Sequence, residues 1–386
     1  MAELRLLVVD DSAMYRQALK GIVETTPGVK CIGQACDGKE AIEKIISDKP
    51  DVVTLDMEMP VMSGMDVIKA VTAKHLSTKL IIVSACSQSG AEVAINALKL
   101  GAYDFITKPN RLSEGGAKEN IRQQLIEKLK ALQGDANKVL KRSLQAPDTA
   151  RNSQRPIAIG RSPTTAGKLV VSKPVTPPSI SRRGLAPKAI AMGCSTGGPK
   201  ALLKLFSGLT CKLDIPIYIV QHMPPMFTQT LAKSIDEIGI VSVKEAEDGE
   251  KPLPNHAYIA PCGLQMKLVH GDAGVEIKIT DDAPENFCKP SVDYFFNSVA
   301  EIYEARALGV ILSGMGSDGS EGLKKMKRHG VTVLGQDEES CVVYGMPRVA
   351  QEAGLIDKQV NIEDMASAIE DVIRCSVKGS KTHANA

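Results

Sequence analysis

Runs of consecutive apolar residues alternate with amphipathic segments along the first third of the chain. Five such runs occupy residues 4–10, 30–36, 51–57, 79–85 and 103–109, and a segment with helical periodicity accompanies each of them. Apolar runs this continuous are typical of strands buried on both faces of a parallel sheet, with the intervening helices covering it. The pattern therefore predicts a doubly wound α/β domain made of five strand–helix units.

A second α/β pattern begins at Ala189. Its apolar runs are residues 189–193, 215–222, 241–246, 257–261, 266–271, 276–281, 307–314 and 331–336. Helical segments are expected at 199–209, after Phe227, at 292–303, at 322–330 and from about Ile362. We expect a second, Rossmann-like parallel sheet, so that the 386 residues form an α/β protein of two domains.

The stretch from Lys138 to Lys188 differs from both halves in composition. It holds eleven Lys and Arg residues against one acid, Asp148, and seven of the chain's 21 prolines. With little apolar surface to offset the entropy of ordering, it is expected to be a flexible basic tether rather than a lipid- or nucleic-acid-binding segment. The predicted organisation is a first domain at 1–130, a linker at 131–186, a second domain at 187–376 and a disordered tail at 377–386.

Composition excludes several classes of protein. Aromatic residues make up 3% of the chain and Trp is absent, which disfavours base stacking and therefore a nucleic-acid partner. The nine cysteines are scattered without a Cys-x-x-Cys pair, no secretory leader stands at the N-terminus, and no apolar stretch is long enough to span a bilayer. We expect a cytoplasmic protein with reduced thiols and no direct membrane insertion.

Polar residues end four strands of the first predicted sheet. Asp10 and Asp11 close the first strand, Asp56 the third, Ser84 the fourth and Lys108 the fifth. The carboxyl ends of parallel strands meet at one edge, where three carboxylates repel each other unless a cation lies among them. Oxygen ligands of this kind suit Mg²⁺, and Asp56 is then placed to attack a phosphoryl donor while Lys108 neutralises the phosphoryl oxygens.

This part of the sequence resembles the response-regulator receiver family over about its first 125 residues. The motifs that carry the resemblance are VVDDS, TLDMEMP, VSA and ITKP. The resemblance implies a flavodoxin-like fold, Asp56 as the phosphoacceptor, and Mg²⁺ held by Asp10, Asp11 and Asp56. It also implies Ser84, Phe105 and Lys108 as the switch residues and a cis bond between Lys108 and Pro109.

In the second half, Ser195 lies among glycines where a strand passes into a helix. Gly193, Gly197 and Gly198 permit a tight turn, and Pro199 suits the first turn of the helix. Such a turn exposes the serine hydroxyl, and the N–H groups that open the helix can receive an oxyanion. The pattern indicates a nucleophile.

A histidine and an aspartate follow two other apolar strands of the same half. His222 ends the strand at 215–221, and Asp318 lies in the glycine-flanked sequence SGMGSDG after the strand at 307–312. We expect Ser195 to attack, His222 to accept and return the proton, and Asp318 to orient the imidazole. His256 is the rival base, but it precedes its strand, which places it at the opposite edge of the sheet.

The second half resembles the CheB family of chemotaxis protein-glutamate methylesterases. The motifs that carry the resemblance are GCSTGGP, QHMPPMFT, HAYIAP, KPSVDYFFNSVA, LSGMGSDGSEGL and YGMPRVAQEAG. It implies Ser195, His222 and Asp318 as catalytic residues, with Thr196, Gly197 and Met315 near the oxyanion and the active site. The sequence departs from the family at Cys194, where a small residue such as Ala is usual, and at APCGLQMKL, where APGDKHM is commoner.

The resemblance also implies a reaction and its partners. The expected substrates are γ-glutamyl methyl esters, and in a second activity glutamines, on methyl-accepting chemotaxis receptors; a chemotaxis histidine kinase is the expected phosphodonor. The esterase itself is expected to need no cofactor. Three alternatives stay open: a receiver with a non-enzymatic binding module, a DNA-binding output, for which no helix-turn-helix is visible, and a deamidase without esterase activity.

Overall fold

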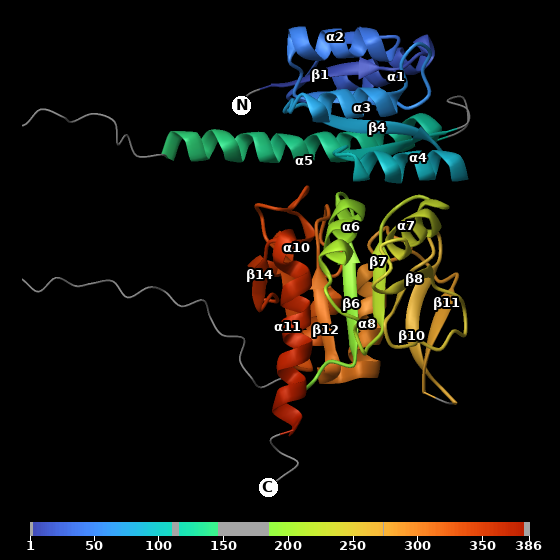
Figure 1. Cartoon of the computed structure of the whole chain (residues 1–386), viewed down its shortest axis with the longest axis vertical. Coiled ribbons are helices and arrows are strands. Elements are labelled where there is room, and N and C mark those ends of the chain that lie inside the picture. Colours follow the sequence, from blue (N-terminus) through green and yellow to red (C-terminus); the bar gives the residue numbers. More distant parts are fainter. Residues whose placement is uncertain (1–2, 110–115, 146–184, 273, 382–386) are drawn as a thin grey trace, which may run out of the picture.

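The computed structural model describes residues 3–109, 116–145, 185–272 and 274–381. These residues form two α/β domains that lie one above the other in Figure 1. The central part of the predicted linker, 146–184, and the end of the predicted tail, 382–386, lie outside the described residues. Among the described helices, none is long and apolar enough to cross a membrane.

The first domain contains a parallel sheet of five strands in the order β2-β1-β3-β4-β5. Its strands are β1 (Leu4–Val9), β2 (Val29–Ala35), β3 (Val52–Asp56), β4 (Lys79–Ala85) and β5 (Asp104–Lys108). Its helices are α1 (Ala13–Glu24), α2 (Gly38–Asp48), α3 (Gly64–Ala73), α4 (Gln88–Lys99) and α5 (Ala117–Gln145). The strand order is that of flavodoxin-like folds, so the predicted fold is confirmed.

Helix α5 continues fifteen residues beyond the predicted domain boundary at residue 130. Its buried stripe, Ile121, Leu125, Leu129 and Leu132, packs on the first domain. The sequence that follows is rich in good helix formers such as Ala, Lys and Leu, so the helix extends past the residues that it buries. At the other end of the chain, helix α11 (Ile362–Lys381) likewise continues past residue 377.

The second domain contains a parallel sheet of seven strands in the order β14-β13-β12-β6-β7-β9-β8. Its strands are β6 (Ala189–Cys194), β7 (Ile217–Gln221), β8 (Ser242–Glu245), β9 (His256–Ile259), β12 (Ala307–Ile311), β13 (Thr332–Gln336) and β14 (Lys358–Val360). The chain moves outward from β6 through β7, then returns to β12 on the other side of β6. This reversal creates the crevice at which α/β sheets bind ligands, and the predicted parallel-sheet architecture is confirmed.

Further elements frame the second sheet. Its helices are α6 (Gly198–Gly208), α7 (Phe227–Asp236), α8 (Val292–Tyr303), α9 (Ser320–Arg328) and α10 (Met346–Glu352), besides α11. Two of the predicted strands, β10 (Gln265–Gly271) and β11 (Gly274–Thr280), pair only with each other as an antiparallel hairpin. The hairpin packs on α8, and it thereby supports the segment that leads into that helix.

The first domain covers one end of the second. In Figure 1, α4 lies over α6 and α7, and one hydrophobic cluster includes Leu98 and Phe105 of the first domain with Phe227 and Leu231 of the second. The rings of Phe105 and Phe227 stack, with centroids 4.8 Å apart.

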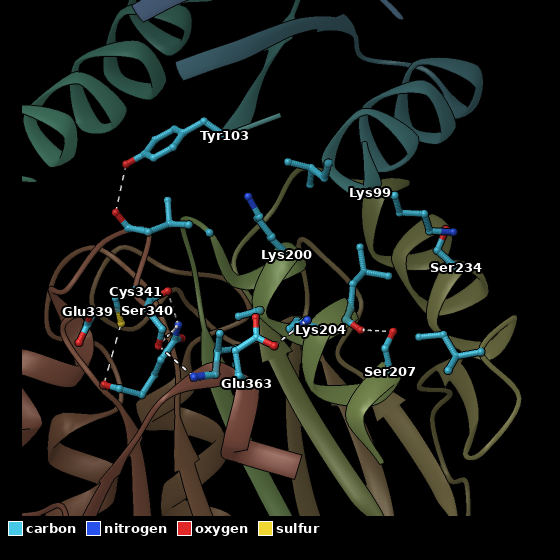
Figure 2. Close-up of a pocket in the computed structure, with 18 of the residues that line it drawn as sticks. Lys99, Tyr103, Lys200, Lys204, Ser207, Ser234, Glu339, Ser340, Cys341 and Glu363 are labelled. Carbon is cyan, nitrogen blue, oxygen red and sulfur yellow. Dashed lines mark hydrogen bonds and ion pairs between the residues drawn. The ribbon is translucent and has the colours of Figure 1, made fainter. Parts of the chain in front are cut away.

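A groove of about 920 Å³ opens beside these contacts, between the two domains. Figure 2 shows Tyr103 pointing from the first domain across this groove, where its hydroxyl donates a hydrogen bond of 3.0 Å to Val342 O.

One expectation about the backbone is wrong. The bond between Lys108 and Pro109 is not cis; the cis peptide bond among the described residues joins Lys289 and Pro290. The carbonyl of Pro109 instead accepts a hydrogen bond of 2.6 Å from the Tyr15 hydroxyl.

Candidate active site

The three predicted catalytic residues follow three adjacent strands of the second sheet. Ser195 follows β6, His222 follows β7 and Asp318 lies in the loop after β12, and the strands stand in the order β12-β6-β7. The register pairs Cys194 with Gln221, so Ser195 and His222 come next at the same edge. His222 N donates to Cys194 O over 3.1 Å, which fixes the two turns against each other.

The turn after β6 needs its glycines. Gly197 has φ of 78°, a conformation that glycine adopts without strain. A Cβ at Gly198 would lie 2.0 Å from Oε1 of Gln221, whose amide nitrogen donates to Ser195 O and His222 O. Among the described residues, the N–H groups of Thr196 and Gly197 donate no hydrogen bond. They are therefore available to an oxyanion beside Ser195.

The carboxylate of Asp318 is buried and accepts hydrogen bonds from six donors. One oxygen accepts from His222 Nε2 (2.9 Å) and Val292 N (2.7 Å). The other oxygen accepts from the side chains of Asn286 (3.1 Å) and Ser291 (2.9 Å) and from the N–H groups of Asp293 (3.0 Å) and Gly319 (3.0 Å). Burial alone would raise the pKa of Asp318, but His222 and the N–H groups that open α8 hold it well below the usual range.

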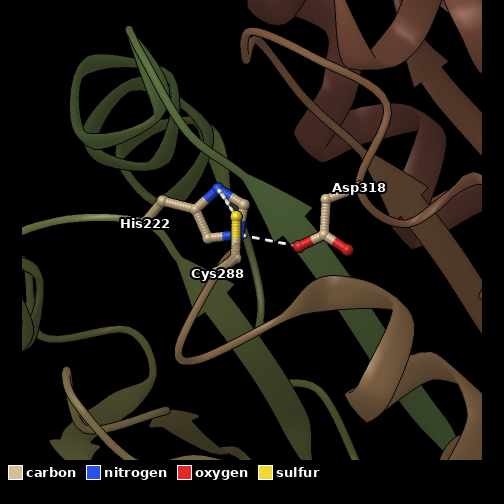
Figure 3. Close-up of side chains that lie close together, drawn as sticks. All are labelled: His222, Cys288 and Asp318. Carbon is tan, nitrogen blue, oxygen red and sulfur yellow. Dashed lines mark hydrogen bonds and ion pairs between the residues drawn. The ribbon is translucent and has the colours of Figure 1, made fainter. Parts of the chain in front are cut away.

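His222 is held at both ring nitrogens. Nε2 bonds to Asp318, and Nδ1 lies 3.9 Å from the thiol of Cys288, as Figure 3 shows. Burial by itself lowers the pKa of His222, but the hydrogen bonds to Asp318 and Cys288 outweigh it and raise the pKa to about 9. An ionised Asp318 fixes the proton of neutral imidazole on Nε2, so that Nδ1 carries the free lone pair.

The Ser195 hydroxyl is half-buried and makes no hydrogen bond within the part of the chain that the structure describes. His222 is therefore hydrogen-bonded to Asp318, and Ser195 lies at the same edge of the sheet without a hydrogen bond between its hydroxyl and His222. Hydrogen bonds of catalytic groups are often formed only once substrate is bound. The loop after β12 lies close to Ser195: a Cβ added at Gly314 would be 3.0 Å from Ser195 Cβ. Met315, the next residue of this loop, is 36% exposed.

Four polar residues that support the site escaped the sequence analysis. Asn286 and Ser291 bond to Asp318, Cys288 contacts His222, and the buried Gln265 accepts from Ser291 N over 2.8 Å. Three of them lie in the irregular segment before α8, where no periodicity indicates which way a side chain points. The cluster of polar residues just before the predicted helix was the available signal. His256 begins β9, at the opposite edge, and its Nδ1 bonds to Pro254 O.

The acidic cluster of the first domain also forms. One ligand oxygen each of Asp10, Asp11 and Asp56 lies within 4.8 Å of the others. Lys108 Nζ is 2.8 Å from Asp10 and 2.6 Å from Asp56. Burial raises the pKa of Asp10 despite that lysine. Asp10 and Asp56 are buried and Asp11 is exposed, and a half-open set of carboxylate oxygens of this kind fits Mg²⁺, which takes hard oxygen ligands.

Of the three predicted switch residues, Lys108 lies in this cluster, and Ser84 and Phe105 lie on the neighbouring strands β4 and β5. The Ser84 hydroxyl donates a hydrogen bond of 2.8 Å to Gly90 O. The side chain of Phe105 is 6% exposed. Phe105 also helps to line a pocket of about 690 Å³ that contains Ser195, Thr196 and His222. The edge of the second sheet is therefore faced by the first domain.

Comparison with known proteins identifies the family. Residues 6–117 match the response regulator receiver domain, and residues 190–369 match the CheB methylesterase domain. A protein-glutamate methylesterase/protein-glutamine glutaminase of Desulfotalea psychrophila is 40% identical, over 97% of this chain and 100% of its own. The chain belongs to the CheB family. Like its family it is a carboxylic-ester hydrolase with a receiver domain.

Other CheB proteins are also similar to this chain. A protein-glutamate methylesterase/protein-glutamine glutaminase of Treponema denticola is 39% identical over 96% of this chain and 98% of its own. Among solved structures, the CheB methylesterase catalytic domain of Thermotoga maritima is 38% identical, covers 49% of this chain and 99% of its own, and has a TM-score of 0.47.

Proposed function

We propose that this chain is a phosphorylation-controlled serine esterase that removes methyl groups from glutamate side chains of methyl-accepting chemotaxis receptors, in chemotaxis adaptation. The observation that carries the proposal is the 2.9 Å hydrogen bond between His222 and Asp318 beside Ser195, in a chain of the CheB family. The relatives' names, which combine methylesterase and glutaminase, support the substrate class.

The reaction is acyl transfer. Ser195 Oγ attacks the ester carbonyl and passes its proton to His222 Nδ1, whose weak contact with the Cys288 thiol gives way to the hydroxyl. The N–H groups of Thr196 and Gly197 hold the oxyanion. Methanol leaves with the proton from His222, and water activated by the same nitrogen releases glutamate and restores Ser195. Asp318 stays ionised throughout and stabilises the imidazolium.

Glutamine presents the same acyl group with ammonia as the leaving group, so the same residues support deamidation. Methanol and ammonia release, measured side by side on membranes that carry methylated receptors, test the activity. We expect both products, with methanol released faster because methoxide is the better leaving group. Ammonia without methanol would contradict the esterase and favour a deamidase; neither product would favour a binding module.

Control by the receiver is supported by its position at the active-site edge. A histidine kinase of the chemotaxis pathway would transfer its phosphoryl group to Asp56; Mg²⁺ held by Asp10, Asp11 and Asp56 would neutralise the phosphoryl oxygens. Lys108 bonds to Asp56 in the unphosphorylated chain and would turn to the phosphoryl group. Ser84 and Phe105 would then shift, and the Phe105–Phe227 stack, which holds the receiver on α7, would loosen.

The control is tested with three forms of the protein: full-length, Asp56→Asn, and the second domain alone from Pro187. We expect the second domain to release methanol faster than unphosphorylated full-length protein, because it lacks the covering receiver. A small phosphodonor with Mg²⁺ should stimulate the full-length protein and leave Asp56→Asn unchanged. Equal rates for the isolated domain and the unphosphorylated chain would contradict inhibition by the receiver.

A further inference from the structure

A thiol lies against the nitrogen that the proposed mechanism uses as its base. Cys288 Sγ is 3.9 Å from His222 Nδ1, and one ligand atom each of His222, Cys288 and Asp318 lies within 4.8 Å of the others. Figure 3 shows the thiol in front of the face of the imidazole and the carboxylate beside the ring. Ester hydrolysis requires the histidine and the carboxylate but gives the thiol no part.

The imidazole is prepared as a metal ligand. Histidines that bind metals through one ring nitrogen usually donate the other N–H to a carboxylate, which fixes the tautomer. His222 makes this arrangement through Nε2 and Asp318, so Nδ1 keeps its lone pair, and Cys288 Sγ lies 3.9 Å from that nitrogen. Asp318 itself is committed to its six hydrogen-bond donors. It therefore orients the ring rather than binding a metal directly.

The separation of nitrogen and sulfur fits one cation. With Zn–N and Zn–S distances of about 2.1 and 2.3 Å and a tetrahedral angle, the two ligand atoms lie about 3.6 Å apart. The observed separation is 3.9 Å. Binding requires the Cys288 side chain to turn toward the plane of the ring, in which the Nδ1 lone pair lies. Imidazole and thiolate together select zinc and similar thiophilic metals over Mg²⁺ and Ca²⁺.

We propose that His222 Nδ1 and Cys288 Sγ bind a thiophilic divalent cation of the Zn²⁺ type, and that the bound metal inhibits the esterase. Binding releases the thiol proton to solvent and takes the lone pair that would accept the Ser195 proton. The inhibitory half of this proposal rests on the proposed function of His222, whereas the metal-binding half does not. The other coordination positions are left to water from the adjoining pocket.

Among the described residues, two other groups of side chains could bind metals, and each of them requires a control. The receiver cluster of Asp10, Asp11 and Asp56 offers only carboxylate oxygens, so excess Mg²⁺ occupies it without competing at a thiolate. An exposed cluster of Cys36, Asp37 and Glu40 does contain a thiol, so Cys36→Ser is one control. Cys86 lines the pocket with His222 but stands outside the cluster, so Cys86→Ser is the matched control.

Binding is measured directly on the full-length protein with Co²⁺ in excess Mg²⁺. Co²⁺ bound to a thiolate gives a sulfur-to-metal charge-transfer absorption, and Zn²⁺ displaces it. We expect this absorption, in one equivalent and displaceable by Zn²⁺, in wild type, Cys86→Ser, Cys36→Ser and Ser195→Ala. It should be lost in Cys288→Ser. An absorption that survives in Cys288→Ser, or its absence from wild type, overturns the site whatever the esterase does.

Inhibition is measured as methanol release under increasing Zn²⁺, with each variant compared with its own metal-free rate. Since loss of even an indirect partner costs about 10- to 100-fold in metal affinity, loss of the thiol ligand should raise the inhibitory concentration at least about 10-fold. Cys86→Ser should be inhibited like wild type. Equal sensitivity of Cys288→Ser and wild type overturns the inhibitory role. Methanol release without metal tests the proposed function separately.

Discussion

At the scale of residues, the direction of the His222 ring decides how the site works. Nε2 bonds to Asp318, so in the proposed mechanism the base acts on Ser195 through Nδ1, the nitrogen nearest Cys288. The six donors around Asp318 keep it ionised, and the ionised carboxylate in turn favours the protonated imidazole. In the proposed mechanism, hydrolysis therefore depends on a histidine whose pKa is raised.

Replacing Asp318 with Asn tests this coupling through the pH profile. His222 must be neutral to accept a proton, so the wild-type rate rises with pH through a pKa raised to about 9. Removing the carboxylate lowers that pKa, so the rising limb should move to lower pH. The maximal rate should fall about 10⁴-fold, the size of effect seen when a triad carboxylate is lost.

The control for this profile is Asp281→Asn, because Asp281 is an exposed acid paired with Lys289. This substitution should change neither the pH at which the rate rises nor the maximal rate. Methanol release from pH 6 to pH 10 is the measurement. If methanol release by Asp318→Asn rises at the same pH as that of wild type, Asp318 does not set the protonation of the base.

Sequence patterns identified the residues at strand ends but not those in irregular segments. Ser195, His222 and Asp318 each follow a recognisable apolar run, so their shared edge could be inferred before the structure was known. Cys288 and Asn286 lie in a stretch without periodicity, and their approach to His222 and Asp318 depends on the path of that stretch. The cluster of polar residues before the predicted helix pointed to this stretch, but not to which of them would contact His222 and Asp318.

At the scale of elements, two loops and one helix terminus hold the site together. The start of α8 supplies two N–H groups to Asp318, and Ser291 caps this helix by accepting from Tyr294 N over 3.3 Å. The loop after β12 passes so close to the serine turn that Ser195 N donates to Ser313 O over 3.0 Å. The active site is therefore an assembly of element ends rather than a feature of one loop.

Replacing Gly314 with Ala tests the closeness of these loops. The added Cβ would lie 2.2 Å from Met346 Sδ and 3.0 Å from Ser195 Cβ, so one neighbour must move. We expect a loss of about 1–3 kcal/mol in the free energy of unfolding, typical of overpacking, together with lower methanol release. Gly21→Ala is the control, because a Cβ there meets nothing within 4 Å. Equal stability and activity of Gly314→Ala and wild type would contradict this packing.

Pairing between elements was harder to predict than their existence. The runs at 266–271 and 276–281 were recognised as strands, but they form the separate β10–β11 hairpin because the chain turns back on itself between Gly271 and Gly274. Two short elements, α10 and β14, were missed because they bury few residues. The extension of α5 to Gln145 was missed because basic composition obscured its helix-forming residues.

At the scale of the whole molecule, the two domains share one apolar interface. The receiver resemblance singled out Phe105 as a switch residue, but Phe227 looks like an ordinary core residue of its own domain, so their stacking could not be inferred from either half of the sequence. Polar contacts surround the stack: Gln88 Nε2 donates to Thr230 Oγ1 over 3.1 Å, and Lys99 pairs with Glu237 at 3.3 Å. Exposed ion pairs of this kind contribute about 0–1 kcal/mol, so the apolar contacts dominate docking.

Replacing Phe105 with Ala should therefore raise the basal rate of the unphosphorylated enzyme. Loss of the stack and of its buried area weakens docking by about 1.5–3 kcal/mol, which corresponds to about 10-fold or more in the population of undocked receiver. Lys99→Ala removes only the exposed ion pair and should change the rate less than about 5-fold. Methanol release without phosphodonor is the measurement. A basal rate of Phe105→Ala no higher than that of Lys99→Ala would contradict control through this interface.

The most direct test of the central claim compares two serines of the same strand-to-helix unit. Ser195→Ala removes the proposed nucleophile, whereas Ser207→Ala removes a hydroxyl at the far end of α6 that donates to Leu203 O. With methylated receptor membranes and phosphodonor, Ser207→Ala should release methanol at the wild-type rate, and Ser195→Ala should lose at least about 10⁴-fold. Methanol release by Ser195→Ala at a rate close to wild type would contradict the account.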